Sequence, residues 1–393
     1  MEGIRKVRTA VVGCGMISNI YIRNLKNLFY IIDLVAVCDR NEEAARAQAA
    51  RFGVEKSLTI DEVAAAEDIE LVINLTPANV HYEIVKKMLL AGKHVYTEKM
   101  FTTSLEQAEE LIRIANEKNL YLGVAPDTIL GAGVQTARHI IDTGLIGDVT
   151  SVQVRLNRNQ SLNSETFRFL RAPGGSLPYD VGIYYVGAML ALLGPVKSVS
   201  AVVNPAPVHQ AELLFSSAPE DSWQVTGSNS VAAALRFESG VIGSVLFDGN
   251  TIGVLKHGFT VYGTRGILEV GDPDKFDGPV RLCLPDQEEI VFPFTHGYDG
   301  KSVFPQPEWF DGYGNRGIGV AEMAWAIRKG RKNNRCSKEY GLHCMEVLIG
   351  MDESAESGTP YEPKSRFVLE PLKPGYYSGS AAFRKDAERS LMD

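Results

Sequence analysis

Cysteines are few in this sequence and stand far apart. The five lie at positions 14, 38, 283, 336 and 344, and no two form a Cys-x-x-Cys pair. That spacing indicates neither a disulfide framework nor a structural zinc site, and no metal site is predicted. The sequence also lacks a run of about 18 apolar residues, the length that a membrane-spanning helix needs. The first residues have no apolar signal-peptide core, and we therefore expect a cytoplasmic protein.

A surplus of basic residues is missing as well. Forty Lys and Arg residues stand against 48 Asp and Glu residues, which gives a formal net charge of -8. Proteins that bind nucleic acids or anionic membranes without specificity carry a basic excess or stripe. We therefore expect neither partner, and a small molecule as the substrate. The length of 393 residues, 45% of them hydrophobic and 22% charged, is typical of two folded domains.

The first part of the chain alternates short apolar runs with helical patterns, which is typical of a parallel α/β sheet. The predicted strands lie at residues 7–12, 34–38, 71–75, 94–97 and 121–124. Asn41 is expected to cap the helix after the second strand and Gly53 to end it, while Ser104 and Gln107 are expected to form a capping box. Residues 1–126 are therefore predicted to form a Rossmann domain with a doubly wound parallel sheet.

The pattern changes after Pro126. A helix is predicted near residues 134–144, and two more near 317–331 and 338–356. Between them, predicted strands follow one another with few helices, at residues 149–156, 196–203, 231–237, 241–247, 259–262 and 267–270. Residues 272–279 are predicted to form a surface loop. We therefore expect residues 127–393 to form an α+β domain, with an open and mostly antiparallel sheet that serves substrate binding and oligomerisation.

The first candidate site is the turn Gly13-Cys14-Gly15-Met16-Ile17-Ser18, which follows a strand and opens a helix. Glycines there let backbone amides approach a pyrophosphate at the helix N-terminus, so Gly13, Gly15, Met16 and Ile17 are candidate cofactor-binding residues. Asp39 ends the second strand and can accept both ribose hydroxyls, which favours NAD. It could instead merely begin a turn. The neighbouring Arg40 could stack on adenine or accept the 2′-phosphate of NADP, so NADP stays possible.

Two further loops are expected at the same sheet edge, because ligands bind beyond the carboxyl ends of strands in open α/β sheets. Polar or turn residues in these loops are candidates for contact with the cofactor: Thr76, Pro77, Asn79, His81, Glu98 and Lys99. His81 could also be only a helix-start residue, and Glu98 with Lys99 only a solvated surface pair. Lys99 is nevertheless placed to point into the cofactor crevice.

A Gly/Pro-rich loop at 173–178 leads into a helix that begins near Asp180 and Tyr184. These two residues are spaced i, i+4, which places both on one helix face. Alternatively, Asp180 could be only a helix cap, and Tyr184 only a core aromatic residue whose hydroxyl reaches water. Arg158 and Arg168, between the first strand of this domain and that helix, are candidate hydrogen-bond partners for a polyol substrate, or solvated loop charges.

These segments, in this order, resemble the Gfo/Idh/MocA oxidoreductase family. The resemblance rests on the Gly13-Cys14-Gly15 turn, Thr76-Pro77 with His81, the run 92–99, and Asp180-x-Gly182-x-Tyr184 ahead of 193–195. It implies a Rossmann domain, an α+β domain, a nicotinamide cofactor, and oligomers built through the second sheet, here a homodimer or homotetramer. It also implies that Lys99, Asp180 and Tyr184 are catalytic and contact the substrate.

Three positions need comment beside the family pattern. Asp127 lies in a stretch, 125–138, that resembles one subgroup, and it is counted with the candidate cofactor-binding residues. Met100 replaces the usual proline after Lys99, so a cis bond there would cost ~3 kcal/mol and Lys99 could be aimed differently. Gly187 stands where the family often has aspartate, which removes one potential polar contact to substrate.

The resemblance predicts an NAD-dependent dehydrogenase that acts on a secondary hydroxyl of a sugar, glycoside or cyclitol. Two other functions remain open. An enzyme with tightly held NAD could use transient oxidation to drive hydrolysis, elimination or epimerisation with no net redox change. A regulator that binds NAD and has lost catalysis is the second, and it is motivated by Met100 and Gly187.

Overall fold

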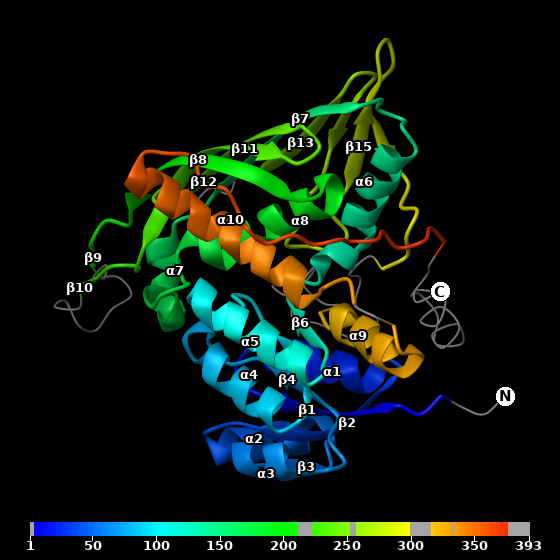
Figure 1. Cartoon of the computed structure of the whole chain (residues 1–393), viewed down its shortest axis with the longest axis vertical. Helices are drawn as coiled ribbons and strands as arrows, with labels where there is room; N and C mark the ends of the chain where they lie inside the picture. The colour runs from blue at the N-terminus through cyan, green and yellow to red at the C-terminus, as the bar shows by residue number, and fades with distance from the viewer. Residues whose placement is uncertain (1–3, 211–221, 252–256, 299–315, 332–333, 376–393) are drawn as a thin grey trace.

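The computed structural model describes residues 4–210, 222–251, 257–298, 316–331 and 334–375. Two sheets dominate this part of the chain, one in each half of the molecule, and the long helix α10 crosses between them (Figure 1). No helix of the described residues is both long and apolar enough to cross a membrane.

The lower half in Figure 1 is a six-stranded, all-parallel sheet in the order β3-β2-β1-β4-β5-β6, with helices on its faces. This is the strand order of a Rossmann fold, and the prediction for this half is confirmed. Its elements are β1 Val7–Val12, α1 Ser18–Asn27, β2 Ile32–Cys38, α2 Glu42–Phe52, β3 Lys56–Leu58, α3 Ile60–Ala65, β4 Leu71–Asn74, η1 Ala78–Val80, α4 His81–Leu90, β5 His94–Thr97, α5 Leu105–Glu117 and β6 Leu122–Val124.

Local sequence signals explain where the helices of this half begin and end. The Asn41 side chain accepts hydrogen bonds from the amides of Glu43 and Ala44, and α2 ends at Gly53, as expected. Ser104 caps α5 by accepting from the Gln107 amide. The reciprocal hydrogen bond of the expected capping box, from the Ser104 amide to the Gln107 side chain, is not formed among the described residues, since Gln107 Oε1 has no partner there. Buried strands of Val, Ile and Leu, such as β4, form the core between the helices.

The upper half is an eight-stranded sheet in the order β16-β15-β14-β13-β7-β12-β11-β8. The elements of this half and of the C-terminal region are η2 Thr128–Leu130, α6 Ala132–Asp142, β7 Val149–Asn157, α7 Gln160–Thr166, η3 Arg168–Arg171, η4 Pro178–Gly182, α8 Ile183–Leu193, β8 Val196–Pro205, β9 His209–Gln210, β10 Ser222–Trp223, β11 Ser228–Phe237, β12 Ile242–Asp248, β13 Gly258–Gly263, β14 Ile267–Glu269, β15 Val280–Cys283, β16 Ile290–Phe292, α9 Ile318–Lys329 and α10 Lys338–Ser357.

The pairing in this second sheet is antiparallel except between β12 and β7, which run parallel. The expected mostly antiparallel sheet is confirmed. Side chains alternate along its strands, so that Val245 and Phe247 face the buried side while Leu246 is 51% exposed. Helix α8 covers the buried side, where the rings of Tyr185 and Phe247 meet edge to face.

Helix α9 follows the second sheet in sequence but lies against the first, whereas α10 packs against β8 of the second sheet as well as against α5 and β6 of the first. The amide of Val124 donates to the carbonyl of Cys336, and Ser337 forms an isolated bridge with Gly123 in β6. Arg328 in α9 donates to the carbonyl of Arg5 and pairs with Glu70. The C-terminal helices therefore fasten the two halves together, and the division of the chain at residue 126 stays a prediction.

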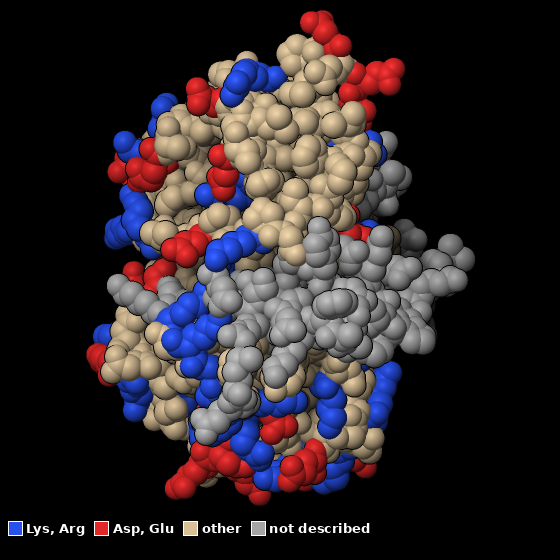
Figure 2. All heavy atoms as spheres, turned by 90° about the vertical axis from the view of Figure 1, so that its right-hand side faces the viewer, with Lys and Arg blue, Asp and Glu red and all other residues tan. Residues whose placement is uncertain are grey.

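Charged residues are distributed unevenly on the face shown in Figure 2. Lys, Arg, Asp and Glu crowd the lower, Rossmann half, with both signs interspersed, while the upper half carries a broad area of uncharged residues. One sequence prediction is wrong here. Residues 272–279 do not form a surface loop, because Phe276 is fully buried and Asp274 pairs with the buried Arg316.

Candidate active site

The turn after β1 has the geometry of a dinucleotide cradle. Gly13 has φ +102°, and a Cβ there would lie 2.7 Å from the Leu75 carbonyl carbon, so that only glycine fits. At Gly15 a Cβ would meet nothing within 4 Å, and the turn is open toward solvent just before α1. Backbone amides at a helix N-terminus favour a phosphate group in such a space.

The two glycines predict opposite results on substitution. Gly15→Val should leave the free energy of unfolding within about 1 kcal/mol, because a Cβ there has no protein atom within 4 Å, yet weaken NAD binding at least about tenfold by filling the pyrophosphate space. Gly13→Ala should destabilise the fold by roughly 2 kcal/mol or more, since it forces both a clash and a positive φ. Denaturant unfolding and calorimetry with NAD measure the two effects. Unchanged NAD affinity in Gly15→Val would remove this turn from the cofactor site.

Asp39 is fixed at the end of β2 by the same turn. One carboxylate oxygen accepts from the Cys14 amide at 2.7 Å and the other from the Asn41 amide at 2.8 Å. Each oxygen keeps a further lone pair for a ligand hydroxyl, so the position fits a ribose. Arg40, Met16 and Gly15 beside it are exposed, and Ile17 is half-buried.

The loop after β4 divides into an outer and an inner part. Pro77 and Asn79 are exposed and Thr76 is half-buried, so that these three border the crevice, whereas His81 is fully buried. The two ring nitrogens of His81 each lie 2.6 Å from a carbonyl oxygen, of Met100 and of Thr76. Burial lowers the pKa of His81, and the two carbonyls oppose that shift. His81 therefore ties this loop to the segment after β5, and its contact with the cofactor stays a prediction.

Lys99 follows β5 at the same edge. The adjacent Glu98 is buried, accepts from the Tyr21 hydroxyl at 2.7 Å, and also accepts from the Lys99 amide. The pair is therefore not a solvated surface pair. The peptide bond between Lys99 and Met100 is cis, although Met100 is not proline. From the sequence, the absence of proline at position 100 had suggested that the Lys99 side chain could point in a different direction than in the family.

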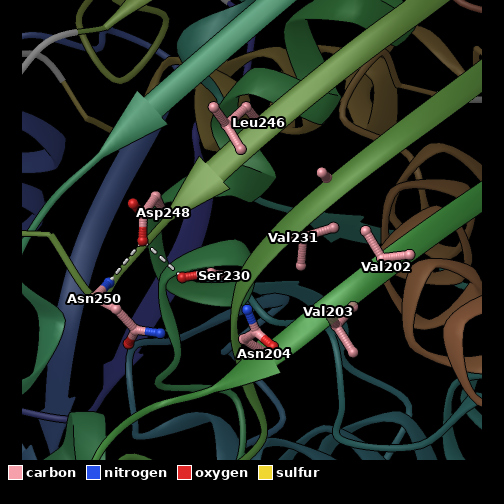
Figure 3. Close-up of a pocket in the computed structure, with 9 residues that line it drawn as sticks. Val202, Val203, Asn204, Ser230, Val231, Leu246, Asp248 and Asn250 are labelled. Carbon is pink, nitrogen blue, oxygen red and sulfur yellow. Dashed lines mark hydrogen bonds between the residues drawn. The ribbon is translucent and has the colours of Figure 1, made fainter.

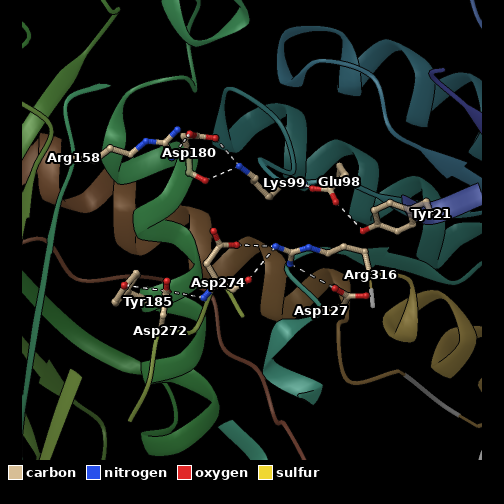
Figure 4. Close-up of polar contacts among 10 residues, drawn as sticks. All are labelled: Tyr21, Glu98, Lys99, Asp127, Arg158, Asp180, Tyr185, Asp272, Asp274 and Arg316. Atoms are coloured by element: carbon tan, nitrogen blue, oxygen red, sulfur yellow. Dashed lines mark hydrogen bonds and ion pairs between the residues drawn. The ribbon is translucent and has the colours of Figure 1, made fainter. Parts of the chain in front are cut away.

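The Lys99 ammonium meets Asp180 across the boundary between the two halves (Figure 4). Its Nζ lies 2.7 Å from Asp180 Oδ1 and 2.5 Å from the Asp180 carbonyl oxygen. The other carboxylate oxygen accepts from Gln160 at 3.2 Å and lies 3.8 Å from the Arg158 guanidinium. Burial acts to raise the pKa of Asp180, but the charges of Lys99 and Arg158 lower it below the ordinary value. The carboxyl group is therefore ionised at neutral pH.

The contribution of the Lys99–Asp180 ion pair to the free energy of unfolding should depend on pH. A carboxyl whose pKa is lower in the folded than in the unfolded chain stabilises the fold above about pH 4 and ceases to do so as the pH falls through its folded pKa. Asp180→Asn should therefore cost roughly 2 kcal/mol at pH 7, because Lys99 loses its counterion, and the difference from the parent should shrink in acid. Denaturant unfolding at pH 7 and pH 3 measures both, with Asp33→Asn as control, because the Asp33 side chain is 44% exposed and water screens its ion pair with Arg8. A difference that stayed constant with pH would contradict the ion pair.

Tyr184 lies beside the same lysine, one helical turn after Asp180. The Lys99 ammonium is 5.4 Å from the centre of its ring, and only 6% of the residue is exposed. Burial raises the pKa of the phenol well above its ordinary value, and the Arg316 guanidinium opposes that rise. Within the described part of the chain, the Tyr184 hydroxyl has no hydrogen-bond partner. The structure thus brings Lys99, Asp180 and Tyr184 together, as the sequence predicted.

Three buried residues that sequence analysis did not single out complete the surroundings. Gln160 supports Asp180, and Arg316 lies with its guanidinium carbon 4.8 Å from the centre of the Tyr184 ring. Arg316 pairs with Asp274 at 2.7 Å. The sequence did place Arg316 directly before the predicted helix at 317–331. Nothing in the sequence pattern, however, predicted that its side chain contacts Tyr184.

Other predicted site residues lie elsewhere. Asp127 is fully buried and accepts from the amides of Gly317 and Gly319, so it caps the start of α9. Its contact with the cofactor stays a prediction.

The two candidate substrate-binding arginines are placed differently. Arg168 is exposed in η3, whereas Arg158 reaches Asp180. A Cβ at Gly187 would lie 2.4 Å from the Tyr340 hydroxyl, so this position faces α10 and has no room for aspartate.

A separate hollow of about 350 Å³ lies on the outer face of the second sheet (Figure 3). Val202, Asn204, Leu246 and Asp248 are among the residues that line it. Asp248 is engaged there by the Ser230 hydroxyl and the Asn250 amide. Because side chains alternate across a strand, this face is the one turned away from α8 and from Lys99.

The Rossmann sheet, the open glycine turn and the acidic residue at the end of β2 define a dinucleotide-binding protein, and the polar cluster at its crevice is typical of an oxidoreductase. Two family models match the chain. Residues 7–125 match the oxidoreductase family with an NAD-binding Rossmann fold, and residues 134–269 match the GFO/IDH/MocA C-terminal domain. The chain belongs to the Gfo/Idh/MocA oxidoreductase family.

Individual relatives are more distant. An uncharacterized oxidoreductase of Schizosaccharomyces pombe is 33% identical over 201 residues, 50% of this chain and 54% of that protein. The scyllo-inositol 2-dehydrogenase (NADP(+)) of Bacillus subtilis is 30% identical over 208 residues, 52% of this chain and 57% of that protein. The chain thus spans about half the length of these curated relatives. The apo structure of levoglucosan dehydrogenase superposes with a TM-score of 0.78 at 21% identity, covers 92% of this chain and 100% of that one, and shows the shared fold.

Proposed function

We propose that this protein is an NAD-dependent dehydrogenase that transfers a hydride between the nicotinamide cofactor and a secondary hydroxyl of a sugar, glycoside or cyclitol. The observation that carries the proposal is the meeting of Lys99, from the carboxyl edge of the Rossmann sheet, with Asp180 and Tyr184 of the second half. Family membership supports the redox chemistry. Two relatives support the class of substrate: the scyllo-inositol 2-dehydrogenase of Bacillus subtilis, and the D-xylose dehydrogenase of Paenarthrobacter nicotinovorans, which is 28% identical over 169 residues.

The residues present fit NAD. Gly13 lets the turn close against Leu75, Gly15 leaves room for the pyrophosphate, and Asp39 holds two carboxylate oxygens at the end of β2 for the ribose hydroxyls. That negative charge disfavours the 2′-phosphate of NADP, while the exposed Arg40 alone offers it a partner. When bound, the cofactor supplies a nicotinamide ring that accepts or returns the hydride.

Lys99 is proposed to hold the substrate oxygen. An ammonium group has three N–H donors, and Lys99 directs two hydrogen bonds to Asp180, which leaves one for a substrate hydroxyl or carbonyl. Asp180 fixes the direction of the lysine and is itself held by Gln160. Positive charge close to the oxygen stabilises the negative charge that develops there as its proton leaves.

Tyr184 is proposed to move the proton. Its Oη takes the proton of the substrate hydroxyl when the alcohol is oxidised and returns it when the ketone is reduced. Because the pKa of the phenol is high, the resting group carries its proton and is ready to act as the acid in reduction. Arg158, half-buried and turned toward Asp180, is placed to bind a neighbouring hydroxyl.

The proposal is tested by screening the purified protein with NAD and with NADP against a panel of sugars, glycosides and cyclitols at the absorbance of reduced nicotinamide. We expect reduction of NAD by at least one polyol, with a rate that rises with pH. Binding of NAD without reduction by any member of the panel would contradict the dehydrogenase and favour a regulator. Product formation without release of NADH would favour a reaction with no net redox change.

Assembly and location are proposals of the same kind. A homodimer or homotetramer through the outer face of the second sheet is supported by exposed apolar side chains there, among them Val202 at 69% and Leu246 at 51%. A cytoplasmic location is supported by five free cysteines, four of them buried.

A further inference from the structure

The ring of Tyr184 lies between two cations that come from opposite parts of the chain. Lys99 approaches it from the end of β5, with Nζ 5.4 Å from the ring centre. Arg316 approaches from two residues before the start of α9, with its guanidinium carbon 4.8 Å from the same centre. Arg316 is only 4% exposed, so water does little to screen its charge.

The side chain of Arg316 is not needed to begin α9. Asp127 already accepts hydrogen bonds from the amides of Gly317 and Gly319, at 2.7 and 3.2 Å, and satisfies the helix start. The guanidinium instead donates to the Asp274 carboxylate at 2.7 Å and to its carbonyl oxygen at 3.2 Å, and it lies against the Tyr184 and Phe276 rings. A buried cation costs free energy unless it is paired, and this one is paired next to a candidate catalytic phenol.

Asp274 is also held in place. The Tyr185 hydroxyl donates to Asp272 at 3.0 Å, and the same carboxylate oxygen accepts from the Asp274 amide at 3.1 Å. Figure 4 shows this chain of contacts running from α8 through the segment after β14 to Arg316. The charged groups that face Tyr184 are therefore Lys99, Arg316, Asp180, Asp274 and Glu98, three anions and two cations.

We propose that Arg316 and Asp274 form a positioning pair that sets the proton affinity of the Tyr184 hydroxyl. The guanidinium stabilises the phenolate, and the Asp274 carboxylate weakens that effect by compensating the guanidinium charge. The proposal rests on the proposed function insofar as Tyr184 handles the substrate proton. The charge arrangement itself can be tested without a substrate.

Asp274 gives the pair a dependence on pH. Burial raises the pKa of Asp274 to about 6, against the opposing effect of Arg316. Below that pH the carboxyl is neutral and the guanidinium acts on the phenol uncompensated, whereas above it the carboxylate offsets part of the positive charge. The affinity of Tyr184 for its proton should therefore rise as Asp274 ionises.

The direct test places 3-nitrotyrosine at position 184 of the full-length protein, because its phenol ionises nearer to neutrality and its phenolate absorbs visible light. Arg316→Gln should raise the pKa of this reporter by at least about one unit, since an ion at this distance acts strongly even at an effective dielectric constant of about 20. Asp274→Asn should lower the pKa, and Arg316→Lys should stay close to the parent. The double variant Arg316→Gln with Asp274→Asn removes both members of the pair and should fall between the single variants.

The opposite signs distinguish this role from a structural one. Arg335→Gln is the matched control, because Arg335 also pairs with a buried carboxylate, Glu322 at 2.9 Å, but lies beyond the other end of α9. It should leave the reporter unchanged. Shifts of the same sign in Arg316→Gln and Asp274→Asn, or no shift in either with the fold retained by circular dichroism, would overturn the proposal. Because no turnover is measured, failure of the proposed dehydrogenase activity would show separately, in the substrate panel.

Discussion

Lys99→Met is expected to lower turnover of the polyol substrate by roughly 10²–10⁴-fold while NAD affinity changes little. Methionine is close to lysine in length but carries no charge and no donor. The substrate oxygen would then lose its hydrogen bond and the positive charge that stabilises the alkoxide. Steady-state kinetics should show the loss in kcat more than in KM, because this interaction strengthens in the transition state. Calorimetry with NAD tests the retained cofactor affinity.

Lys93→Met is the matched control for that experiment. Lys93 is also buried and stands just before β5, whereas Lys99 stands just after it, and its ammonium donates to the carbonyl of Ala66, far from the crevice. It should keep turnover within a few fold. Full activity of Lys99→Met would remove this lysine from the mechanism, and equal losses in both variants would indicate a general effect of replacing a buried lysine.

Tyr184→Phe is expected to lower turnover by roughly 10²-fold or more, since it removes the oxygen that we propose exchanges a proton with the substrate. The rates of oxidation and reduction should also depend on pH, in opposite directions. Burial raises the pKa of this phenol, so in the parent enzyme alcohol oxidation should speed up with rising pH as the phenolate forms, while ketone reduction should slow. The variant should lose that dependence in both directions. Measuring kcat/KM across pH for oxidation and reduction checks this.

Tyr179→Phe provides the comparison for Tyr184. Tyr179 lies in the same helical start, and its hydroxyl donates to Asp352 in α10 at 2.5 Å, away from Lys99. Its loss should cost stability but leave the pH profile unchanged. If Tyr184→Phe kept both its rate and its pH dependence, another group would have to carry the proton.

Much of the fold follows from local patterns in the sequence. Strands such as β4 are continuous apolar runs buried on both faces, and α2 begins and ends at the predicted Asn41 and Gly53, whereas β3 has no such run and was not predicted. Short elements were harder to predict, because β15 and β16 have only four and three residues and too little pattern to separate them from loops. Their register depends on pairing with β14, which is a contact distant from local sequence.

The candidate site also contains residues that the sequence pointed to and contacts that depend on distant parts of the chain. The position of Lys99 after a strand predicted that it points into the cofactor crevice, and the family resemblance implied that Asp180 and Tyr184 belong to the same site. The partnership of Arg316 with Asp274 depends on the return of the chain from the second sheet to α9, and no spacing in the sequence encodes it. His81 was predicted at the right edge, but whether it points outward or inward is decided by the carbonyls of Thr76 and Met100.

The most direct test of the central claim is a crystal structure of the protein with NADH and a substrate found in the panel. The account predicts a nicotinamide ring in the crevice between the two halves, with Lys99 Nζ and Tyr184 Oη both within hydrogen-bond distance of one substrate oxygen whose carbon faces the ring. A ring bound elsewhere on the Rossmann sheet, or a substrate oxygen that contacts neither group, would contradict it.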